Sequence, residues 1–493
     1  MKEKWPGACG LVLEEDLIFE RGRKGRKGYS WPQLDVEKVD PQQIWPSKWV
    51  RQDWEGFPEL SEVEVVRHFT RLAQWNYGVD SGFYPLGSCT MKYNPKVNEE
   101  LARLPGFSGL HPYQPEETVQ GALRLMCELE KFLCQISGMD RVTLQPAAGA
   151  HGELTGLLMI RAYLTDRGNP RKKVLVPDTA HGTNPASSSL CGYQAIQVKS
   201  NERGILSPQA IEEKMDEEVA ALMVTNPNTL GLFEEQICQI AEVVHRKGGQ
   251  IYCDGANLNA LMGWSRVADM SVDVLHFNLH KTFSTPLGGG GPGAGPVGVK
   301  EHLVPYLPIP TLAEEQGRYR LDYDRPRSIG KVRSFYGNFG VWVRAYAYIL
   351  SMGPEGLRRA SSVALLNANY LRAKLKDDYA LPYDSACMHE CVFSDRLQSR
   401  YGVTALDIAK RLMDYGFHPP TIYFPLLVHG ALMIEPTESE AKEGLDQFIE
   451  AMVQIAREAE ADPALLQNAP YKTKVSRLDE VLANRKPRLR WKP

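Results

Sequence analysis

The 493 residues are 43% hydrophobic and 24% charged, with a formal net charge of −3 at pH 7. A chain of this length can bury a sizeable core, and its nearly balanced charge gives no reason to expect nucleic-acid binding. No apolar run approaches the ~20 residues that span a membrane, and the opening MKEKWPGACG lacks a secretory apolar core. The nine cysteines are odd in number and scattered, which favours reduced thiols in a cytoplasm. The Cys, His and Asp residues show no metal-site spacing, so we expect no metal.

The first 80 or so residues give few structural signals apart from the basic run RGRKGRKGYS at 21–30, and such a charge run is most often solvated surface. From about 140 to 300, strand and helix patterns alternate, which predicts an α/β fold with a mainly parallel sheet and helices on both faces. Residues 380–460 predict a smaller α+β domain, followed by a mobile basic tail. The expected domains are an N-terminal arm over 1–80, a large domain over 81–340 and a small C-terminal domain over 341–493.

The first strand and helix of this alternation lie in VTLQPAAGAHGELTGLLMIRAYL, residues 142–164. VTLQ is typical of a strand, and the apolar positions from Glu153 onward predict a helix with one largely apolar face. Ala148, Gly149 and Ala150 lie between them, and their small side chains leave the backbone N–H groups at the helix start open to a phosphate. The segment lacks the GxGxxG of dinucleotide folds and the GxxxxGKS of phosphate-binding loops, so nicotinamide and ATP are less favoured.

The next two strands end in further polar residues. In KKVLVPDTAHGTNPASSSL, residues 172–190, the strand KVLVP leads to His181 and then to a helix that starts in TNPAS. An imidazole at that place could stack on a planar cofactor ring and move a proton, although a hydrogen-bonded turn histidine is an equally good interpretation. The strand in ALMVTNPNTLGLFE, residues 221–234, ends in Thr225 and Asn226, which could reach the polar edge of such a ring.

The segment QIYCD, residues 250–254, predicts a short strand ending in Asp254, and the loop DGANLN with Ala256 begins there. Ligands of open α/β sheets lie beyond the carboxyl ends of the strands. An aspartate at that position can pair with a protonated pyridine nitrogen and so make the ring an electron sink. It can equally cap a turn or a helix.

Residues 273–295, DVLHFNLHKTFSTPLGGGGPGAG, place Lys281 after an apolar strand and ahead of a run of glycines. A lysine bonds to an aldehyde cofactor only when its amine is neutral, a state that burial favours. The glycines allow the main chain to approach a ligand closely. A lone lysine is usually a surface residue. Together with Asp254 and His181, however, Lys281 predicts a pyridoxal phosphate site in which the cofactor is covalently bound to Lys281 and contacted by His280.

Several longer strings carry a family resemblance, and they span roughly residues 80–445. They are YPLGSCTMKYNP (84–95), AHGTNPAS (180–187), DGANLNA (254–260), NLHKTF (278–283) with the following GGGGPG, LLNANYL (365–371), DYGFHPPT (414–421) and MIEPTESE (433–440). These strings resemble the glycine decarboxylase component of the glycine cleavage system, the P-protein.

The resemblance implies the type I fold of pyridoxal phosphate enzymes, with Lys281, Asp254 and His181 as the catalytic residues. It implies decarboxylation of glycine and transfer of an aminomethyl group to the lipoyl arm of the H-protein. The lipoyl disulfide is reduced in that step, so the enzyme would be an oxidoreductase, an aminomethyl-transferring glycine dehydrogenase. Single-chain members have two similar halves, and this chain resembles the C-terminal half alone. The resemblance therefore implies subunit 2 of the split form, a subunit 1 partner and an α2β2 assembly. Residues 1–80 resemble the family less clearly, and we interpret them as an arm that contacts the partner, with solvated surface as the alternative for the basic run.

Two points stay open at this level. Thr183 and Asn184 are candidates, by position only, for binding the glycine carboxylate, and a residue of the partner is an alternative. Two other functions are also compatible with the residues. One is a simple amino acid decarboxylase of the same fold, which would release an amine, and the other is a catalytically silent scaffold subunit. The intact HKT context of Lys281 argues against the scaffold.

Overall fold

The computed structural model describes residues 13–51, 56–287 and 293–491, and the chain divides into two compact units. The main unit comprises residues 79–468. The terminal unit combines residues 1–78 with residues 469–493, so the basic tail belongs to the same unit as the N-terminal segment. Every residue that the sequence assigns to the cofactor site lies in the main unit.

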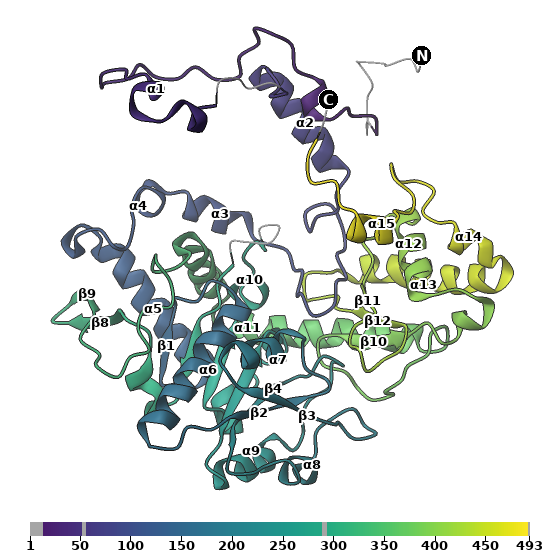
Figure 1. Ribbon diagram of the computed structural model, residues 1–493. Helices are drawn as coiled ribbons and strands as arrows, with labels where there is room; N and C mark the ends of the chain where they lie inside the picture. The colour runs from purple at the N-terminus through teal and green to yellow at the C-terminus, as the bar shows by residue number, and fades with distance from the viewer. Residues whose placement is uncertain (1–12, 52–55, 288–292, 492–493) are drawn as a thin grey trace. The chain divides into compact units, whose positions relative to one another are not determined.

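A seven-stranded sheet forms the centre of the main unit (Figure 1). Its strand order is β1-β7-β6-β5-β4-β2-β3. The strands from β6 to β3 pair in parallel, whereas β7 runs antiparallel to both β6 and β1. The expected α/β architecture with a mainly parallel sheet is therefore confirmed. The strands are β1 (Arg141–Thr143), β2 (Lys173–Pro177), β3 (Gln194–Val198), β4 (Val219–Thr225), β5 (Gln250–Gly255), β6 (Val274–Phe277) and β7 (Val297–Val299).

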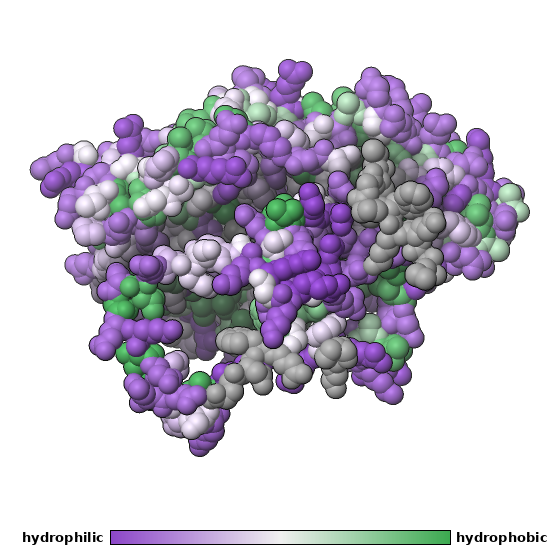
Figure 2. Space-filling model, turned by 90° about the horizontal axis from the view of Figure 1, so that it is seen from above, coloured by the Kyte–Doolittle hydropathy of each residue, from purple (hydrophilic) through white to green (hydrophobic). Residues whose placement is uncertain are grey.

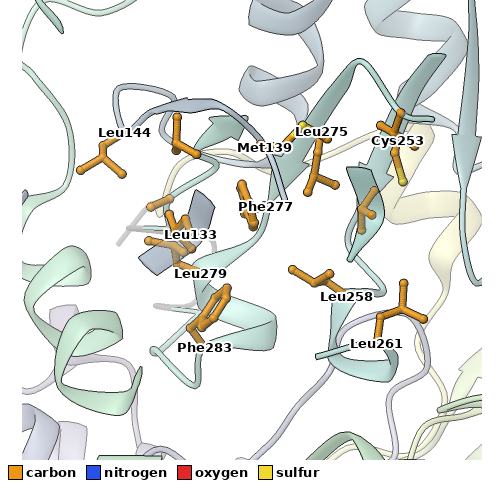
Figure 3. Packing of buried hydrophobic residues seen from close by; sticks show 14 of the residues in the cluster. Leu133, Met139, Leu144, Cys253, Leu258, Leu261, Leu275, Phe277, Leu279 and Phe283 are labelled. Carbon is orange, nitrogen blue, oxygen red and sulfur yellow. The ribbon is translucent and has the colours of Figure 1, made fainter. Parts of the chain in front are cut away.

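Alternate side chains of the central strands pack into two hydrophobic clusters, one on each face of the sheet. Leu275 and Phe277 of β6 belong to the cluster that includes residues of α5 and α9 (Figure 3). Val274 belongs to the cluster that includes residues of α6, and α7 packs beside α6. All seven residues of β4 are buried, as expected for a strand covered on both faces. The helices are α3 (Lys96–Ala102), α4 (Pro105–Ser108), α5 (Gln120–Ser137), α6 (Gly149–Asp166), α7 (Thr183–Leu190), α8 (Pro208–Glu212), α9 (Ile237–Arg246) and α10 (Leu279–Thr282).

The long helix α11 (Phe339–Leu375) connects the sheet to a smaller α+β part of the main unit, residues 379–468, which we call the small lobe (Figure 1). The helix bends at Gly353, whose backbone is not helical, with φ 58° and ψ 179°. In the small lobe, α12 and α13 pack with a sheet of order β10-β12-β11 into one core. Its elements are β10 (Cys391–Ser394), α12 (Ala405–Asp414), β11 (Thr421–Ile422), β12 (Ala431–Ile434), α13 (Lys442–Ala461) and α14 (Pro463–Gln467). The hairpin of β8 (Thr311–Glu315) and β9 (Arg318–Asp322) precedes α11.

The terminal unit contains α1 (Pro41–Ile44), α2 (Glu62–Gln74) and α15 (Glu480–Arg485). Helix α2 begins with a capping box, in which Ser61 and Glu64 each satisfy a backbone N–H of the first turn. Its buried His68 hydrogen-bonds to Glu15 at 2.9 Å. The described part of this unit also carries many exposed large hydrophobic side chains. Among them are Tyr29, Trp31, Leu34, Val36, Trp45, Trp49 and Phe57.

The face drawn in Figure 2 is mostly hydrophilic, with hydrophobic residues in scattered groups. Within the described residues, no helix has both the length and the apolar character needed to cross a membrane. Short 3-10 helices occur throughout the chain. They are η1 (Ile18–Glu20), η2 (Ser47–Trp49), η3 (Glu116–Thr118), η4 (Leu258–Ala260), η5 (Val267–Met270), η6 (Glu301–Tyr306) and η7 (Gln398–Tyr401).

Candidate active site

Three buried side chains stand in one row at the carboxyl ends of adjacent parallel strands. Thr225 of β4 pairs in register with Asp254 of β5, and Asp254 pairs in register with His276 of β6. Residues in register on parallel strands point to the same face of the sheet. Tyr252, two residues before Asp254, packs in the cluster that contains α6, so the row lies on the face that α6 covers.

His276 connects Asp254 to Tyr252. Its Nε2 lies 3.1 Å from Asp254 Oδ1, and its Nδ1 lies 2.8 Å from the Tyr252 hydroxyl. Asp254 also accepts hydrogen bonds from the Ala256 N–H at 2.9 Å and from the Asn184 side chain at 3.2 Å. Burial acts to raise the pKa of Asp254, but His276 and the Ala256 N–H outweigh it and hold that pKa well below its usual value. Asp254 is therefore a fixed negative charge at the base of the site.

Glycines allow α6 to lie directly on the strands that carry this row. A Cβ atom at Gly156 would come within 2.4 Å of the Tyr252 ring, and one at Gly152 within 2.8 Å of the His276 Cβ. At Gly149 it would meet the side chain of Asn278 at 2.8 Å. The close approach puts the N-terminus of the helix beside the carboxyl end of β6.

The helix α6 begins at Gly149, so the sequence-based start at Glu153 was wrong. The apolar pattern identifies only the part of the helix that packs on a core, whereas the first turn consists of small and polar residues. Ala148 is the N-cap, and no side chain caps the helix there. Ala148 and Ala150 are exposed, so the first-turn N–H groups are accessible to an anion. This agrees with the predicted role of residues 148–150, and phosphate binding stays a prediction.

Lys281 is held on the short helix α10 by two core residues that flank it. Leu279 and Phe283 are both fully buried, and both point into the cluster around Leu133 (Figure 3). The half-buried Lys281 directs its Nζ to the backbone carbonyl of Ser88, to which it donates a hydrogen bond of 2.8 Å. Packing of Leu279 and Phe283 thus fixes the backbone of α10, while the Lys281 amine points to a polar group outside the hydrophobic cluster.

His280 and the glycine run complete this side of the site. The His280 Nδ1 accepts a hydrogen bond from the Ala294 N–H at 3.3 Å, and burial and the charge of Lys281 lower the pKa of His280 to about 4. The imidazole is therefore neutral at pH 7. Of the predicted glycine loop, residues 288–292 lie outside the described residues, so the expected close approach of that part to a ligand stays a prediction.

His181 lies in the turn between β2 and α7, as the sequence indicated, and its ring is exposed. The Nδ1 accepts a hydrogen bond from the Thr183 N–H at 3.2 Å, which orients the ring. The Thr183 hydroxyl donates to Glu153 at 2.7 Å. Asn184 is fully buried beside Asp254, which favours a role in holding that carboxylate over direct contact with a substrate.

The remaining predicted contact residues differ in whether their polar groups already have hydrogen-bond partners. The Thr225 hydroxyl is buried and has no hydrogen-bond partner among the described residues, so it can serve a ligand. The Asn226 side chain is already used, because it accepts from the Glu234 N–H at 3.0 Å and donates to the Met270 sulfur at 3.6 Å. Ala256 contributes its N–H to Asp254.

Sequence reasoning missed His276, Tyr252 and Glu153. The nearest polar atoms of Glu153, Asp254 and His276 lie within 4.8 Å of one another, and all three side chains are buried. The sequence did contain a signal for His276 and for Tyr252. His276 interrupts an otherwise apolar strand, and Tyr252 lies two residues before Asp254, on the same face of β5. No local pattern marks Glu153, which lies in the first turns of α6.

The residues present fit pyridoxal phosphate. The open helix N-terminus suits the phosphate, Asp254 suits a protonated ring nitrogen, and the unpartnered Thr225 hydroxyl suits a ring oxygen. Lys281 supplies the amine for covalent attachment. A reaction that needs an electron sink beside a lysine can be supported here.

Comparison with known proteins places the chain in a family. The family described as "Glycine cleavage system P-protein" matches residues 35–311, and that described as "Glycine dehydrogenase, C-terminal domain" matches residues 360–474. A protein of Caldanaerobacter subterraneus subsp. tengcongensis, named "Probable glycine dehydrogenase (decarboxylating) subunit 2", is 62% identical over 96% of this chain and 98% of its own. A protein of the same name from Bacillus velezensis is 58% identical over 97% of this chain and 98% of its own.

Solved structures with the same fold include an inhibitor-bound glycine decarboxylase, the P-protein of the glycine cleavage system. Its TM-score is 0.71 at 21% identity, over 85% of this chain and 95% of that one. A C-DES variant with glycine covalently linked to its pyridoxal phosphate has a TM-score of 0.59 at 13% identity, over 76% and 97% of the two chains. These likenesses confirm the expected type I fold. On the family match over more than half of its length and these relatives, the chain belongs to the glycine cleavage system P-protein family, among its subunit 2 members.

Proposed function

We propose that this chain is the lysine-bearing subunit of a glycine decarboxylase. It binds glycine through pyridoxal phosphate held at Lys281, releases carbon dioxide and passes an aminomethyl group to the lipoyl arm of an H-protein. The observation that carries the proposal is that Lys281 and Asp254 come together at the carboxyl ends of the neighbouring strands β6 and β5. The charge of Lys281 contributes to the lowered pKa of Asp254. When bound, pyridoxal phosphate supplies the conjugated ring that accepts the electron pair left by departing carbon dioxide.

The chain's own residues would prepare the site for this chemistry. Asp254, held by His276 and the Ala256 N–H, would keep a proton on the ring nitrogen. The first turn of α6, at residues 148–150, would bind the phosphate through backbone N–H groups. The exposed His181 ring would stack on the cofactor and move a proton. Thr225 would donate its hydroxyl to the ring oxygen, with Asn226, Ala256 and His280 as further contacts.

Thr183 and Asn184 stay our candidates near the glycine carboxylate, but their hydrogen bonds support an indirect role. The Thr183 hydroxyl donates to Glu153, and the Asn184 amide donates to Asp254. Their substitution by alanine should therefore loosen Glu153 and Asp254. If they act only in this way, a residue of the partner subunit is the better candidate for the carboxylate.

The designation "subunit 2" of the relatives implies a partner subunit 1. We propose an α2β2 assembly in which residues 1–80 contact that partner. Exposed apolar groups in the terminal unit support this contact, because Trp31 is 86% and Trp49 67% exposed. Apolar surface of this kind marks protein interfaces. Residues 81–340 would bind the cofactor. Of the small domain expected over 341–493, residues 341–468 belong to the main unit, and the tail 469–493 belongs to the terminal unit.

The test is to purify the chain with and without subunit 1 and to follow its visible absorbance and glycine-dependent carbon dioxide exchange. The chain alone should bind pyridoxal phosphate but decarboxylate little. Without subunit 1 the interface is uncovered, and the loops that border it would lack the fixed geometry that bond cleavage needs. Adding subunit 1 at fixed cofactor, glycine and lipoylated H-protein should raise the rate. Full turnover by the chain alone, with sedimentation unchanged by subunit 1, would contradict the two-subunit assignment.

Two further outcomes separate the alternatives. Release of a free amine independent of lipoylated H-protein would indicate a simple amino acid decarboxylase, and absence of the Schiff-base absorbance band would indicate a scaffold. We also place the enzyme in the cytoplasm. The cysteines that the structure describes are all free, which supports a reducing compartment.

A further inference from the structure

Residues 85–92, which we call the crossing segment, connect the small lobe to the catalytic lysine. On the small-lobe side, Leu86 forms a β-bridge with Ile434 at the end of β12. On the other side, the backbone carbonyl of Ser88 accepts the hydrogen bond of Lys281 Nζ. The sequence string around this segment contributes to the family resemblance, but none of the roles proposed above uses it.

Two glutamates of the small lobe hold the crossing segment by its backbone. Glu390 Oε2 accepts a hydrogen bond from the Ser88 N–H at 2.7 Å. Glu435 accepts from the Thr90 N–H at 2.9 Å and from the Thr90 hydroxyl at 2.6 Å. Ser88 and Thr90 both adopt left-handed backbone conformations, with φ of 63° and 48°. Such conformations persist only where the surroundings impose them, and the two carboxyl groups accept the N–H groups of both left-handed residues.

These carboxyl groups lie close to each other in the interior of the main unit. Glu390, Glu435 and His389 are all fully buried, and their nearest polar atoms lie within 4.8 Å of one another. Glu390 Oε1 and both ring nitrogens of His389 have no hydrogen-bond partner among the described residues. Burial raises the pKa of both glutamates, and the neighbouring carboxylate raises that of Glu390 further. Two fully buried carboxyl groups this close to each other cannot both be ionised.

Lys281 is the positive charge that acts on the Glu390–Glu435 pair. Burial, and then the charge of Lys281, lower the pKa of His389 to about 3, so this histidine is neutral at pH 7. Cys89, Cys387 and Glu438 are further titratable neighbours, and none of them adds a positive charge. Lys92, the cation of the crossing segment, is paired with Glu438 at 2.7 Å. Lys281 acts on both carboxyls.

We propose that Glu390 and Glu435 form a carboxyl pair that carries one proton, and that its single negative charge positions Lys281 through the Ser88 backbone and balances the charge of the lysine amine. Glu435 is the ionised member, because both of its oxygens accept hydrogen bonds. Glu390 is the protonated member, because one of its oxygens has no donor among the described residues. Both are positioning residues, and the proposal deepens the proposed function, from which the role of Lys281 is taken.

The test measures the charge state of Lys281 in the cofactor-free full chain. The pH dependence of Lys281 labelling by an amine-reactive reagent, followed by peptide mapping, reports the pKa of the amine. Glu390→Gln replaces a neutral acid by a neutral amide and should leave this pH profile unchanged. In Glu435→Gln the remaining Glu390 should ionise, since its charged neighbour is gone, and the profile should move little. The double variant loses the charge, so the midpoint should fall by about one to two pH units.

Infrared spectra give a second measurement that does not depend on whether the double variant folds. The wild-type chain at neutral pH should show a protonated-carboxyl band that is absent from Glu390→Gln. The matched control is Glu234→Gln, because Glu234 is also a buried glutamate whose pKa is raised by burial, to about 7. Glu234 accepts hydrogen bonds from the Asn228 side chain and the Leu206 N–H, so its substitution should leave the Lys281 profile unchanged.

Three results would overturn the proposal. The first is a wild-type spectrum that shows no band lost in Glu390→Gln. The second is a substantial shift of the Lys281 midpoint in each of Glu390→Gln and Glu435→Gln, with a shift in the double variant that equals their sum. The third is a stoichiometric divalent ion that is retained by the wild-type chain and lost in Glu435→Gln, which would make the cluster a metal site. None of these measurements uses cofactor, glycine or a partner, so they can fail while the decarboxylase assignment stands.

Discussion

Replacing Asp254 by Asn removes one negative charge from the base of the site and leaves its shape nearly unchanged. The carboxylate oxygens face His276 Nε2 at 3.1 Å, the Ala256 N–H at 2.9 Å and the Asn184 amide at 3.2 Å. In the variant, the new amide group must point its N–H toward one of these donors. Leaving a buried donor unpaired costs about 1–3 kcal/mol, so we expect a loss of stability of that size.

The effect on turnover should be larger and of a different kind. Two unit charges about 4 Å apart interact with about 4 kcal/mol at an effective dielectric constant near 20. If that interaction holds the ring nitrogen protonated throughout the reaction, its loss corresponds to a rate reduction of about 10³-fold, since each 1.36 kcal/mol is tenfold. Cofactor content should change much less, because the proposed phosphate site, at the start of α6, is left intact.

The assay is glycine decarboxylation by the complete complex, with cofactor content and thermal unfolding measured on the same samples. Asp273→Asn is the matched control. Asp273 is also a buried carboxylate, accepting from the Ile251 N–H at 2.7 Å and pairing with His245 at 2.7 Å, but it precedes β6 at the opposite end of the strand from the site. It should lose similar stability with little loss of turnover. Only a few-fold loss of rate in Asp254→Asn, or equal losses in both variants, would refute the role assigned to Asp254.

Three further predictions use other parts of the molecule. Lys281→Ala should fold but lose covalent cofactor attachment; borohydride reduction and peptide mapping of the wild-type chain should find the label at Lys281, and label at another lysine would refute the assignment. Gly295→Ala should destabilise the chain and weaken cofactor binding, because a Cβ atom there would lie 2.1 Å from the Ala148 carbonyl oxygen. The control is Gly121→Ala in α5, where a Cβ atom would meet no atom within 4 Å. In urea unfolding this control should raise the free energy of unfolding by about 0.5–1 kcal/mol. The hydrogen bond to Asp273 raises the pKa of His245, so this pair stabilises the fold fully below the unfolded pKa of about 6.5 and less as pH rises through the folded value. The free energy of unfolding should therefore decline over that range, and a decline that persists unchanged in His245→Gln would assign it to another group.

The sequence predicted the parts of the site that lie where a buried strand visibly ends. Asp254 follows an apolar run directly, and Lys281 lies four residues after the end of the next one. Their meeting at one sheet edge therefore required only that β5 and β6 be neighbours. The start of α6 was misplaced because its first turn carries small residues that an apolar pattern does not detect. His276 was overlooked because its significance depends on the register of β6 against β5, which local sequence does not specify.

Glu390 and Glu435 could not have been found by such reasoning. Glu390 lies 302 residues from the Ser88 N–H that it binds, and Glu435 lies 345 residues from Thr90. Their importance arises only when β10 and β12 fold against the crossing segment and bury both carboxyls. A glutamate in an isolated string gives no sign that it will be fully buried.

The row formed by Thr225, Asp254 and His276 limits how this enzyme family can change in length. Because the three side chains are aligned by backbone pairing, one residue inserted or deleted within β4, β5 or β6 would turn its functional side chain to the opposite face without breaking the sheet. Insertions in the connections before these strands would leave the alignment intact. Length variation among descendants of this sequence should therefore collect in the connections and be absent from the last residues of these strands.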